Sequence, residues 1–152
     1  LGLERPVIVH PGGGWSSKLW PAESSGELAS RLARRGIATL VTWGPGEQAL
    51  AGRVVAASGG TAVAGFEATL LDLAALARRA RAIVSADTGP VHLACAVGTP
   101  AVALFGPTDP ARNGPWNPAD IVLARRPPCF PCHRLGPLPA PCCSETSPAE
   151  CQ

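Results

Sequence analysis

Three polar residue types surround one Gly-Pro turn in the middle of the chain. Asp87 follows an apolar run typical of a buried strand, and Pro90 is a favourable first residue of a helix. Backbone N–H groups at the start of such a helix lack intrahelical partners and attract anions. Thr88, Gly89 and His92 lie in that same start, where they can donate hydrogen bonds to a phosphate or a sugar. The alternative is structural, with Asp87 or Thr88 capping the helix, but the convergence exceeds what a cap requires.

A glycine-rich segment precedes the only lysine of the sequence. Residues 10–21 read His-Pro-Gly-Gly-Gly-Trp-Ser-Ser-Lys-Leu-Trp-Pro. Glycines such as Gly13 let backbone N–H groups approach an anion closely. Lys18, preceded by Ser17, lies just before a helix expected at Pro21, where the helix dipole favours negative charge. The segment therefore suits a diphosphate, the alternative being a glycine turn with a solvated lysine. It matches neither G-x-G-x-x-G nor a P-loop, which disfavours a dehydrogenase or an NTP hydrolase.

Two further loops hold polar side chains. Glu47 follows a glycine-proline turn after an apolar run, and a carboxylate at such a strand end can accept hydrogen bonds from two ribose hydroxyls. The alternative is that Glu47 only occupies the favourable first turn of a helix. Thr108 lies in a Gly/Pro loop over residues 106–118 and could reach a ligand. We expect Asp109 and Arg112 of that loop to be structural.

Alternating strand and helix patterns separate these segments. Apolar strand patterns cover Val7–His10, Ile37–Trp43, Ala82–Ala86 and Ala101–Phe105, with a weak short strand at Thr61–Val63 and a last one at Ile121–Ala124. Helical patterns run from Pro21 to about Arg35, over Glu47–Ala57, over Leu70–Ala80 with Thr69 as the cap, and over Pro90–Gly98. This alternation predicts an α/β fold with a Rossmann-like, doubly wound parallel sheet. Such sheets bind ligands at the carboxyl ends of their strands, so we expect the polar loops on one rim.

The composition fits one globular domain. The chain has 152 residues, of which 46% are hydrophobic and 16% charged. A net charge of +2 is too small to favour nucleic acid or an anionic membrane surface as a partner. No apolar run reaches the length of a transmembrane segment, and the first residues do not resemble a secretory signal. The sequence contains no Met, even at position 1, so we expect it to be a piece of a longer protein.

Five of the six cysteines lie beyond residue 126, where the composition turns to Pro and Cys. We therefore expect a Rossmann-like domain over residues 1–125 and a Cys/Pro-rich tail over 126–152. We assign no metal site, and the candidates for zinc are Cys129, Cys132, His133 and Cys142. Structural thiols and disulfides are the alternatives, and a cytoplasmic origin would keep the thiols reduced. Cys95 is expected to be a small buried apolar residue.

The motif around Asp87 carries a family resemblance. The stretch Asp-Thr-Gly-Pro-Val-His-Leu-Ala at 87–94, with Gly-Thr-Pro at 98–100 and Ala-Leu-Phe-Gly-Pro-Thr-Asp-Pro at 103–110, resembles glycosyltransferase family 9, the heptosyltransferases. Residues 10–21 look like the donor loop of that family. The resemblance covers nearly the whole chain and corresponds to the C-terminal, donor-binding half of a two-domain GT-B enzyme. It implies that Lys18 contacts the donor's phosphate and sugar, Glu47 holds the ribose, Asp87 faces the transferred sugar, and Thr88, Gly89 and His92 line the diphosphate.

The resemblance also implies the reaction. The family transfers L-glycero-D-manno-heptose from an ADP donor to lipopolysaccharide, with inversion and without an essential metal or other cofactor. An inverting transfer must stabilise the departing diphosphate, and Lys18 with the helix at Pro90 supplies a cation and a dipole for this. The resemblance implies a catalytic base in the N-terminal acceptor domain, which this sequence does not contain. We therefore assign no catalytic residue and expect the chain to be inactive alone.

Two other interpretations remain open at this point. One is a nucleotide- or phosphosugar-binding module without transfer activity, and the other is a metal- or redox-dependent interaction module built on the cysteine tail. By the resemblance, we expect a bacterial, cytoplasmic protein, with the full-length enzyme associating peripherally with the inner face of the inner membrane. Its expected partners are the nucleotide-sugar donor, ADP-heptose, and the N-terminal acceptor domain of the same enzyme.

Overall fold

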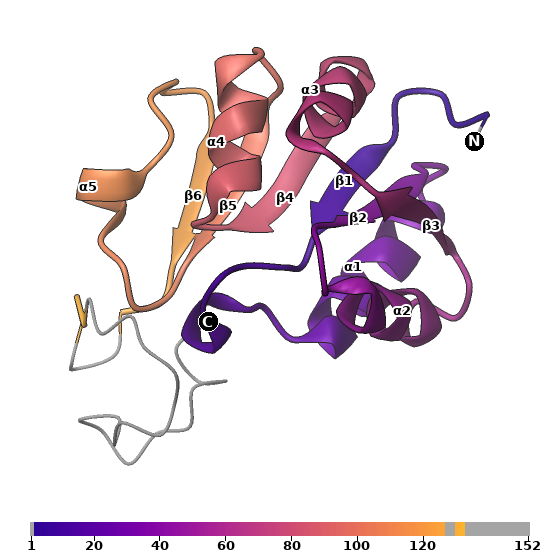
Figure 1. The fold of residues 1–152 in the computed structure, drawn as a ribbon, viewed down its shortest axis with the longest axis horizontal. Coiled ribbons are helices and arrows are strands. Elements are labelled where there is room, and N and C mark those ends of the chain that lie inside the picture. The colour runs from indigo at the N-terminus through magenta and orange to yellow at the C-terminus, as the bar shows by residue number, and fades with distance from the viewer. Residues whose placement is uncertain (1, 127–129, 133–152) are drawn as a thin grey trace.

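The computed structural model describes residues 2–126 and 130–132. Six strands form one sheet in the order β3-β2-β1-β4-β5-β6, and every neighbouring pair is parallel. The strands are β1 (Val7–His10), β2 (Thr39–Trp43), β3 (Ala62–Glu67), β4 (Ala82–Ala86), β5 (Ala101–Phe105) and β6 (Ile121–Ala124). Helices cover both faces of this sheet (Figure 1). The predicted Rossmann-like, doubly wound parallel sheet is confirmed.

The helices divide between the two faces. They are α1 (Ala22–Ala33), α2 (Gln48–Ala57), α3 (Leu70–Arg79), α4 (Gly89–Ala96) and the single turn α5 (Pro110–Asn113), with a 3₁₀ turn η1 at Ser16–Lys18. α1 and α2 pack against each other on one face, while α3 and α4 pack against each other on the opposite face. The strand order runs outward from β1 to β3 and then from β4 to β6 in the other direction. The connection through α3 therefore places β4 directly beside β1.

β1 shows how the core is divided. Ile8 packs with Ala77 of α3 and Val91 of α4, whereas Val9 packs on the other face toward Leu28 of α1. All four residues of β1 are buried. Successive side chains of a strand point to opposite faces, so a strand covered on both sides is mainly apolar, as Val7–Val9 are here before the buried His10 that ends β1. This explains the unbroken apolar run that the sequence shows there.

β3 is longer than predicted. The sequence indicated a short strand at 61–63, but pairing with β2 continues over the six residues 62–67. β3 is an edge strand, so its outer positions are exposed, including Phe66, and Gly65 interrupts the run of apolar side chains while the pairing continues. A Cβ on Gly65 would lie 2.9 Å from the carbonyl oxygen of Val41, which explains a glycine inside the strand.

Two helix starts follow from local capping. Thr69 caps α3 as predicted, because its side chain accepts a hydrogen bond from the Asp72 N–H and the Asp72 carboxylate accepts one from the Thr69 N–H. The predicted Gly/Pro loop at 106–118 contains the one-turn helix α5. Asp109 caps it by accepting the Ala111 N–H at 2.9 Å, which is the structural role expected for Asp109. Among the described residues, no helix is long and apolar enough to cross a membrane.

Candidate functional site

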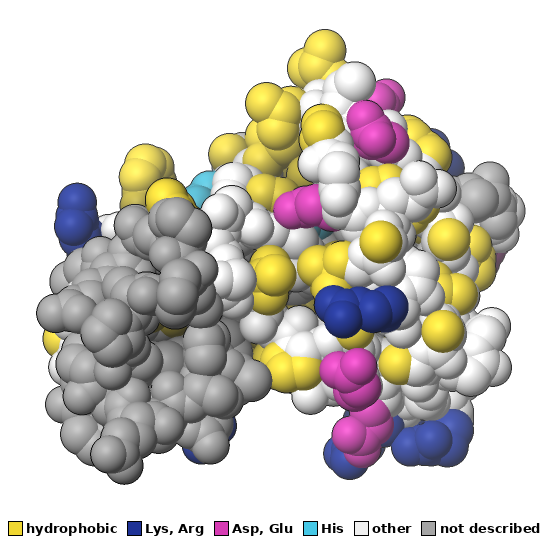
Figure 2. Space-filling model, turned by 60° about the horizontal axis from the view of Figure 1, so that its bottom comes forward, with side chains coloured by type: hydrophobic (Ala, Val, Ile, Leu, Met, Phe, Trp, Pro, Cys, Tyr) yellow, Lys and Arg dark blue, Asp and Glu magenta, His cyan; other side chains and the backbone are white. Residues whose placement is uncertain are grey.

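The polar loops meet at the carboxyl end of the sheet, around the junction of β1 and β4. Loops after β1, β2, β4 and β5 all leave the sheet at this edge, because the strands are parallel. Figure 2 turns this end toward the reader, with hydrophobic side chains along its upper part and acidic side chains among them. The chain reverses its direction of strand addition between β1 and β4. In open α/β sheets, ligands bind beside such a reversal.

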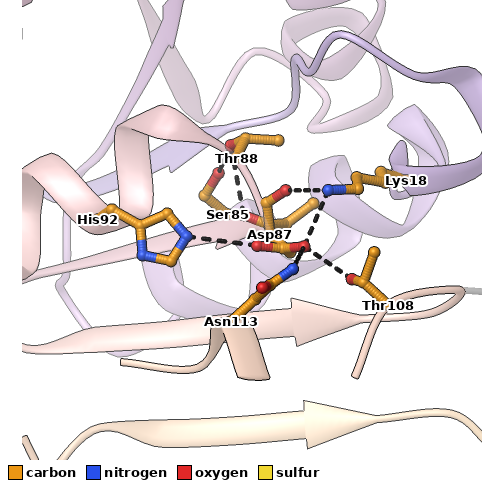
Figure 3. Close-up of polar contacts among 8 residues, drawn as sticks. Lys18, Ser85, Asp87, Thr88, His92, Thr108 and Asn113 are labelled. Atoms are coloured by element: carbon orange, nitrogen blue, oxygen red, sulfur yellow. Dashed lines mark hydrogen bonds and ion pairs between the residues drawn. The ribbon is translucent and has the colours of Figure 1, made fainter. Parts of the chain in front are cut away.

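Asp87 is the centre of a hydrogen-bond network drawn from three of these loops (Figure 3). Its Oδ2 accepts from Lys18 Nζ at 2.8 Å, Thr108 Oγ1 at 2.7 Å and Asn113 Nδ2 at 3.2 Å. Its Oδ1 lies 3.3 Å from His92 Nε2 on the other side. Lys18 also donates to the backbone carbonyl of Asp87 at 2.9 Å. Both partners of the ion pair are buried, with Lys18 9% exposed and Asp87 5% exposed.

The network sets the charge of Asp87. Burial acts to raise the pKa of this carboxyl, but hydrogen bonds from Lys18, Thr108 and Asn113, together with the lysine's positive charge, outweigh it and hold the pKa below the ordinary value of 3.8. Asp87 is therefore an anion at neutral pH. A general base works best when its pKa lies near the operating pH, so this environment suits a carboxylate that binds or orients groups rather than one that takes up a proton.

The start of α4 has no side-chain cap. The hydroxyl of Thr88, at the N-cap position, lies 3.2 Å from Ser85 Oγ and donates to the Ala86 carbonyl at 3.3 Å. The capping role considered for Thr88 or Asp87 is therefore wrong. The first backbone N–H groups of α4, beginning at Gly89, are left to bind an external acceptor. Gly13 packs closely against Thr88 at the start of α4, because a Cβ on Gly13 would lie 2.7 Å from Thr88 Cγ2.

Glu47 joins the loops after β1 and β2. Its Oε1 accepts the Gly13 N–H at 2.8 Å, and its Oε2 accepts the Gly44 N–H at 2.9 Å. A Cβ on Gly12 would fall on this carboxylate, so the loop packs directly against it. Glu47 occupies the N-cap position of α2 without a capping hydrogen bond. Its side chain is a quarter exposed, and each oxygen keeps a lone pair for another donor.

Two contributors to the site escaped the sequence-based prediction. His10 ends β1 with Nδ1 3.0 Å from Thr42 Oγ1 and Nε2 3.6 Å from Glu47 Oε2. Burial lowers the pKa of His10 from 6.5, against the opposing effect of the Glu47 charge, so the ring is neutral at pH 7. Asn113 binds Asp87 from the end of α5. Neither belongs to a recognisable spacing, because the sheet register and the α5 turn bring them to the site.

Two cavities flank the turn at Asp87–Gly89. The Glu47 cavity, of about 400 Å³, lies between the starts of α2, α3 and α4. Its lining includes His10, Gly13, Trp43, Gly44, Glu47, Leu73, Thr88 and Pro90. The Trp116 cavity, of about 660 Å³, lies between α4 and residues 112–117. Its lining includes Asp87, His92, Cys95, Arg112, Asn113 and Trp116.

Other predicted residues are less central. Ser17 is half-buried in η1 directly before Lys18. Cys95 differs from the expected buried apolar residue, because it is partly exposed and its thiol lies 3.5 Å from Asp120 Oδ2. Burial and the Asp120 charge raise the pKa of this thiol to about 11, which makes it a poor nucleophile.

The zinc candidates fall mostly beyond the described part of the chain. Cys129, His133 and Cys142 lie outside the described residues, and Cys132 is a partly buried free cysteine whose N–H donates to the Pro107 carbonyl at 2.9 Å. Within residues 2–126 and 130–132, no group of three or more His, Cys, Asp or Glu side chains could hold a metal ion.

The fold is that of a Rossmann-like α/β domain, with the candidate ligand site at the reversal of its strand order. The family model described as glycosyltransferase family 9 (heptosyltransferase) matches residues 1–137. The chain belongs to this family.

Individual relatives agree with the family. Lipopolysaccharide heptosyltransferase 1 of Pseudomonas aeruginosa is 38% identical over 132 residues, which cover 86% of this chain and 37% of the relative. Among solved structures, E. coli heptosyltransferase WaaC with ADP superimposes with a TM-score of 0.72 at 28% identity, covering 82% of this chain and 39% of that chain. E. coli ADP-heptose lps heptosyltransferase II superimposes with a TM-score of 0.75 at 27% identity, covering 82% of this chain and 40% of that chain. The chain thus spans well under half the length of the relatives it matches.

Proposed function

We propose that this chain is the C-terminal, donor-binding domain of an inverting, metal-independent heptosyltransferase of lipopolysaccharide core synthesis, with ADP-heptose as its donor. The observation that carries the proposal is the buried Lys18–Asp87 pair at the strand reversal, beside the uncapped start of α4 and the Glu47 cavity. A nucleotide sugar needs these three features side by side, for its sugar, its diphosphate and its nucleoside. The solved relatives support this donor, since WaaC structures carry ADP or ADP-2-deoxy-2-fluoro heptose.

The nucleoside is assigned to the Glu47 cavity. The carboxylate of Glu47 is fixed by two backbone N–H groups and can accept hydrogen bonds from the ribose hydroxyls with its remaining lone pairs. Apolar side chains of the cavity, among them Trp43 and Leu73, suit the faces of a nucleobase. The backbone N–H groups at Thr88 and Gly89 then lie where the diphosphate leaves the cavity, and Gly13 allows its close approach.

The departing diphosphate is stabilised by charge and dipole. Lys18 provides a cation held at a fixed position by Asp87, and α4 provides the positive end of a helix dipole. His92, in the first turn of α4 and exposed, adds a donor on the same side. Because these groups are preorganised by the fold, they need little rearrangement as negative charge develops on the leaving group.

The acceptor hydroxyl needs a base, and we assign none among the described residues of this chain. Asp87 is held as an anion of depressed pKa and is engaged by several donors, so we assign it to the donor's sugar. We place the base in an N-terminal acceptor domain of the same enzyme. The chain alone is therefore expected to bind the donor without transferring its sugar, and the full-length enzyme is assigned to the cytoplasm and the inner face of the inner membrane.

Calorimetric titration of the 152-residue chain with ADP, UDP and GDP tests the proposal. We expect saturable binding with ADP preferred, and a loss of roughly 1–3 kcal/mol for Lys18→Ala, as for a lost charged hydrogen bond. Arg53→Ala, which removes an exposed cation from α2, is the matched control and should bind as the parent chain does. Preference for UDP or GDP would exclude ADP-heptose as the donor. A folded chain that binds none of the three nucleotides would overturn the donor-binding role.

A further inference from the structure

A hollow lined by arginines lies where β1 and β4 begin, at the end of the sheet opposite the arrowheads in Figure 1. This arginine hollow has a volume of about 670 Å³, and its lining consists of Leu3, Glu4, Arg5, Arg78, Arg79, Ala80 and Arg81. The length of β4 separates Arg81 from Asp87 by about 20 Å, at a rise of about 3.3 Å per residue. The hollow is therefore distinct from the site at the carboxyl end of the sheet.

The backbone holds the arginines of the hollow together. The Arg81 N–H donates to the Pro6 carbonyl at 2.9 Å, which fixes the segment before β1 against the segment before β4. β1 and β4 then continue side by side as paired parallel strands. Arg78 and Arg79 end α3 immediately before this contact. The four guanidinium groups thus come from three adjacent pieces of chain whose positions are set by the sheet.

The guanidinium groups have no partners of their own. Arg5, Arg78, Arg79 and Arg81 are exposed, and none of them forms an ion pair within residues 2–126 and 130–132. Four guanidinium groups and the carboxylate of Glu4 give the lining a charge of +3. The net charge of +2 for the whole chain hides this local excess. Two of the four arginines complement the dipole at the end of α3, but the other two lie outside any helix.

Arg5 is held in an unfavourable backbone conformation. Its φ is 42°, and it is the one residue other than glycine with a positive φ in the part of the chain that the structure describes. Left-handed backbone costs free energy for most L-amino acids and is ordinarily occupied by Gly or Asn. Strained residues of this kind are frequent at binding sites. The strain at Arg5 points to a use for its guanidinium in the hollow.

We propose that the arginine hollow binds a ligand group that carries at least two phosphates, either free in solution or on a lipid headgroup. A guanidinium binds phosphate oxygens through two parallel hydrogen bonds. A single phosphate carries a charge of only about −2, so four guanidinium groups suit a larger anion. The lining has no aromatic side chain to stack on a nucleobase, unlike the Glu47 cavity with its Trp43. This inference uses no residue of the proposed donor site.

NMR titration of the ¹⁵N-labelled 152-residue chain tests the inference, with the backbone N–H signals of Arg79 and Arg81 as reporters. The titration is run at about 0.15 M salt, which screens charges more than about 8 Å apart. The probes are triphosphate, inorganic phosphate and citrate. We expect triphosphate to shift both signals and the other two anions to bind at least about fivefold more weakly. The absence of any shift with triphosphate, or equal affinity for citrate, would overturn the inference.

Matched variants separate the hollow from the general charge of this end of the molecule. The double variant Arg79→Gln, Arg81→Gln should bind triphosphate at least about tenfold more weakly, read from the Arg5 N–H. Arg34→Gln, Arg35→Gln removes the same charge from a separate hollow beside the end of α1 and should stay within about twofold of the parent chain. Equal losses in the two double variants would overturn the inference.

A third variant uses the strain at Arg5. Asparagine tolerates left-handed backbone, so Arg5→Asn should fold at least as stably as the parent chain. The same variant should bind triphosphate at least about threefold more weakly, because it lacks the guanidinium. Unfolding in urea and the NMR titration measure the two effects separately. Unchanged triphosphate affinity in a folded Arg5→Asn chain would contradict the inference.

Vesicle sedimentation distinguishes the two sources of the phosphates. Phosphatidylcholine vesicles are prepared with cardiolipin, which has two phosphates, or with phosphatidylglycerol, which has one, at equal surface charge. Preference for cardiolipin that is lost in Arg79→Gln, Arg81→Gln would assign a lipid headgroup. Binding of triphosphate without this preference would assign a free ligand. ADP is titrated separately with the Gly89 N–H as the reporter of the donor site, so failure of the donor proposal is recognised independently.

Discussion

The side chains of Lys18 and Asp87 meet across the strand reversal, with Nζ 2.8 Å from Oδ2, although 69 positions separate them in the sequence. A second hydrogen bond of 2.9 Å fixes the ammonium to the Asp87 backbone carbonyl. Both groups are buried, so the pair is desolvated and its geometry is restricted. The only lysine of the chain is thus held at the end of β4 by the fold itself, so under the proposed function stability and donor binding would depend on the same contact.

Replacing Lys18 by Met should destabilise the fold. Asp87 would keep Thr108 and Asn113 as neutral donors but would lose its counter-charge, and an uncompensated buried carboxylate costs about 3 kcal/mol. Urea unfolding of Lys18→Met, Asp87→Asn and the double variant measures this loss and its coupling. We expect the double variant to lose less unfolding free energy than the two single variants lose together, by at least about 1 kcal/mol. If the two single losses of unfolding free energy simply add in the double variant, the interaction between Lys18 and Asp87 does not stabilise the fold.

Acid should weaken the fold through Asp87. The folded-state pKa of Asp87 is held below 3.8, so the unfolded chain takes up the proton first as the pH falls. The contribution of Asp87 is therefore complete above about pH 5 and is lost as the pH falls through 3.8 toward the folded-state pKa. Urea unfolding at pH 6, 5, 4 and 3.5 should show a steeper decline for the parent chain than for Asp87→Asn. Asp72, whose pKa is also lowered by its hydrogen bonds to Thr69, is present in both proteins and cancels in the comparison.

Two neighbouring glycines offer a matched pair for the glycine loop. A Cβ on Gly12 would overlap the Glu47 carboxylate, whereas a Cβ on Gly14 would meet nothing within 4 Å. Gly12→Ala should displace Glu47 from the Gly13 and Gly44 N–H groups and weaken ADP binding by about 1–3 kcal/mol. Gly14→Ala should bind ADP as the parent chain does. Calorimetry on both variants decides whether ADP binding depends on the shape of the loop or only on its flexibility. Equal losses of ADP affinity in the two variants would exclude the proposed clash with Glu47.

The sequence predicted the elements better than the contacts between them. Apolar runs located β1, β4 and β5 at their observed bounds, because strands packed on both faces carry mainly apolar side chains, with His10 and Ser85 as the polar exceptions. β3 was predicted too short, because Gly65 interrupts the apolar run although the backbone pairing with β2 continues to Glu67.

Within the candidate site, the rule that parallel strands end on one rim brought Lys18, Glu47 and Asp87 together in advance. The rule could not reveal that Asn113 reaches Asp87 at 3.2 Å, because that contact depends on the single turn of α5. Nor could it show that His10 stands beside Glu47, which follows from the pairing of β1 with β2. The order of elements along the chain predicts which loops share a rim, whereas the contacts between their side chains also depend on the register of the strands.

Glu47→Gln should show whether this carboxylate binds the ribose hydroxyls. Glutamine keeps one acceptor oxygen but replaces the other by a donor, which the Gly13 or Gly44 N–H cannot use. We expect ADP binding to weaken by about 1–3 kcal/mol. The parent chain should bind ADP more tightly than 2′-deoxy-ADP or 3′-deoxy-ADP, and Glu47→Gln should lose this discrimination. If the variant discriminates as well as the parent chain, the ribose hydroxyls are recognised by another group.

His10 should give the fold a second pH dependence, close to neutrality. Burial lowers the folded-state pKa of His10 below 6.5, so as the pH falls through 6.5 the unfolded chain gains a proton that the folded chain does not. The stabilising contribution is complete above about pH 7.5 and declines below it until the folded-state pKa is reached. Urea unfolding between pH 8 and pH 5.5 should therefore show stability that rises with pH in the parent chain.

Two amides that do not titrate separate the charge of His10 from its hydrogen bonds. Asparagine can place its amide near the Nδ1 position and keep the contact with Thr42, while glutamine can reach the Nε2 position beside Glu47. Both His10→Asn and His10→Gln should flatten the slope between pH 8 and pH 5.5, because neither can take up a proton. A slope that persists in both variants would assign the titration to another group. If only His10→Gln keeps ADP binding near the parent value, the contact beside Glu47 is the one that positions the carboxylate for the ribose.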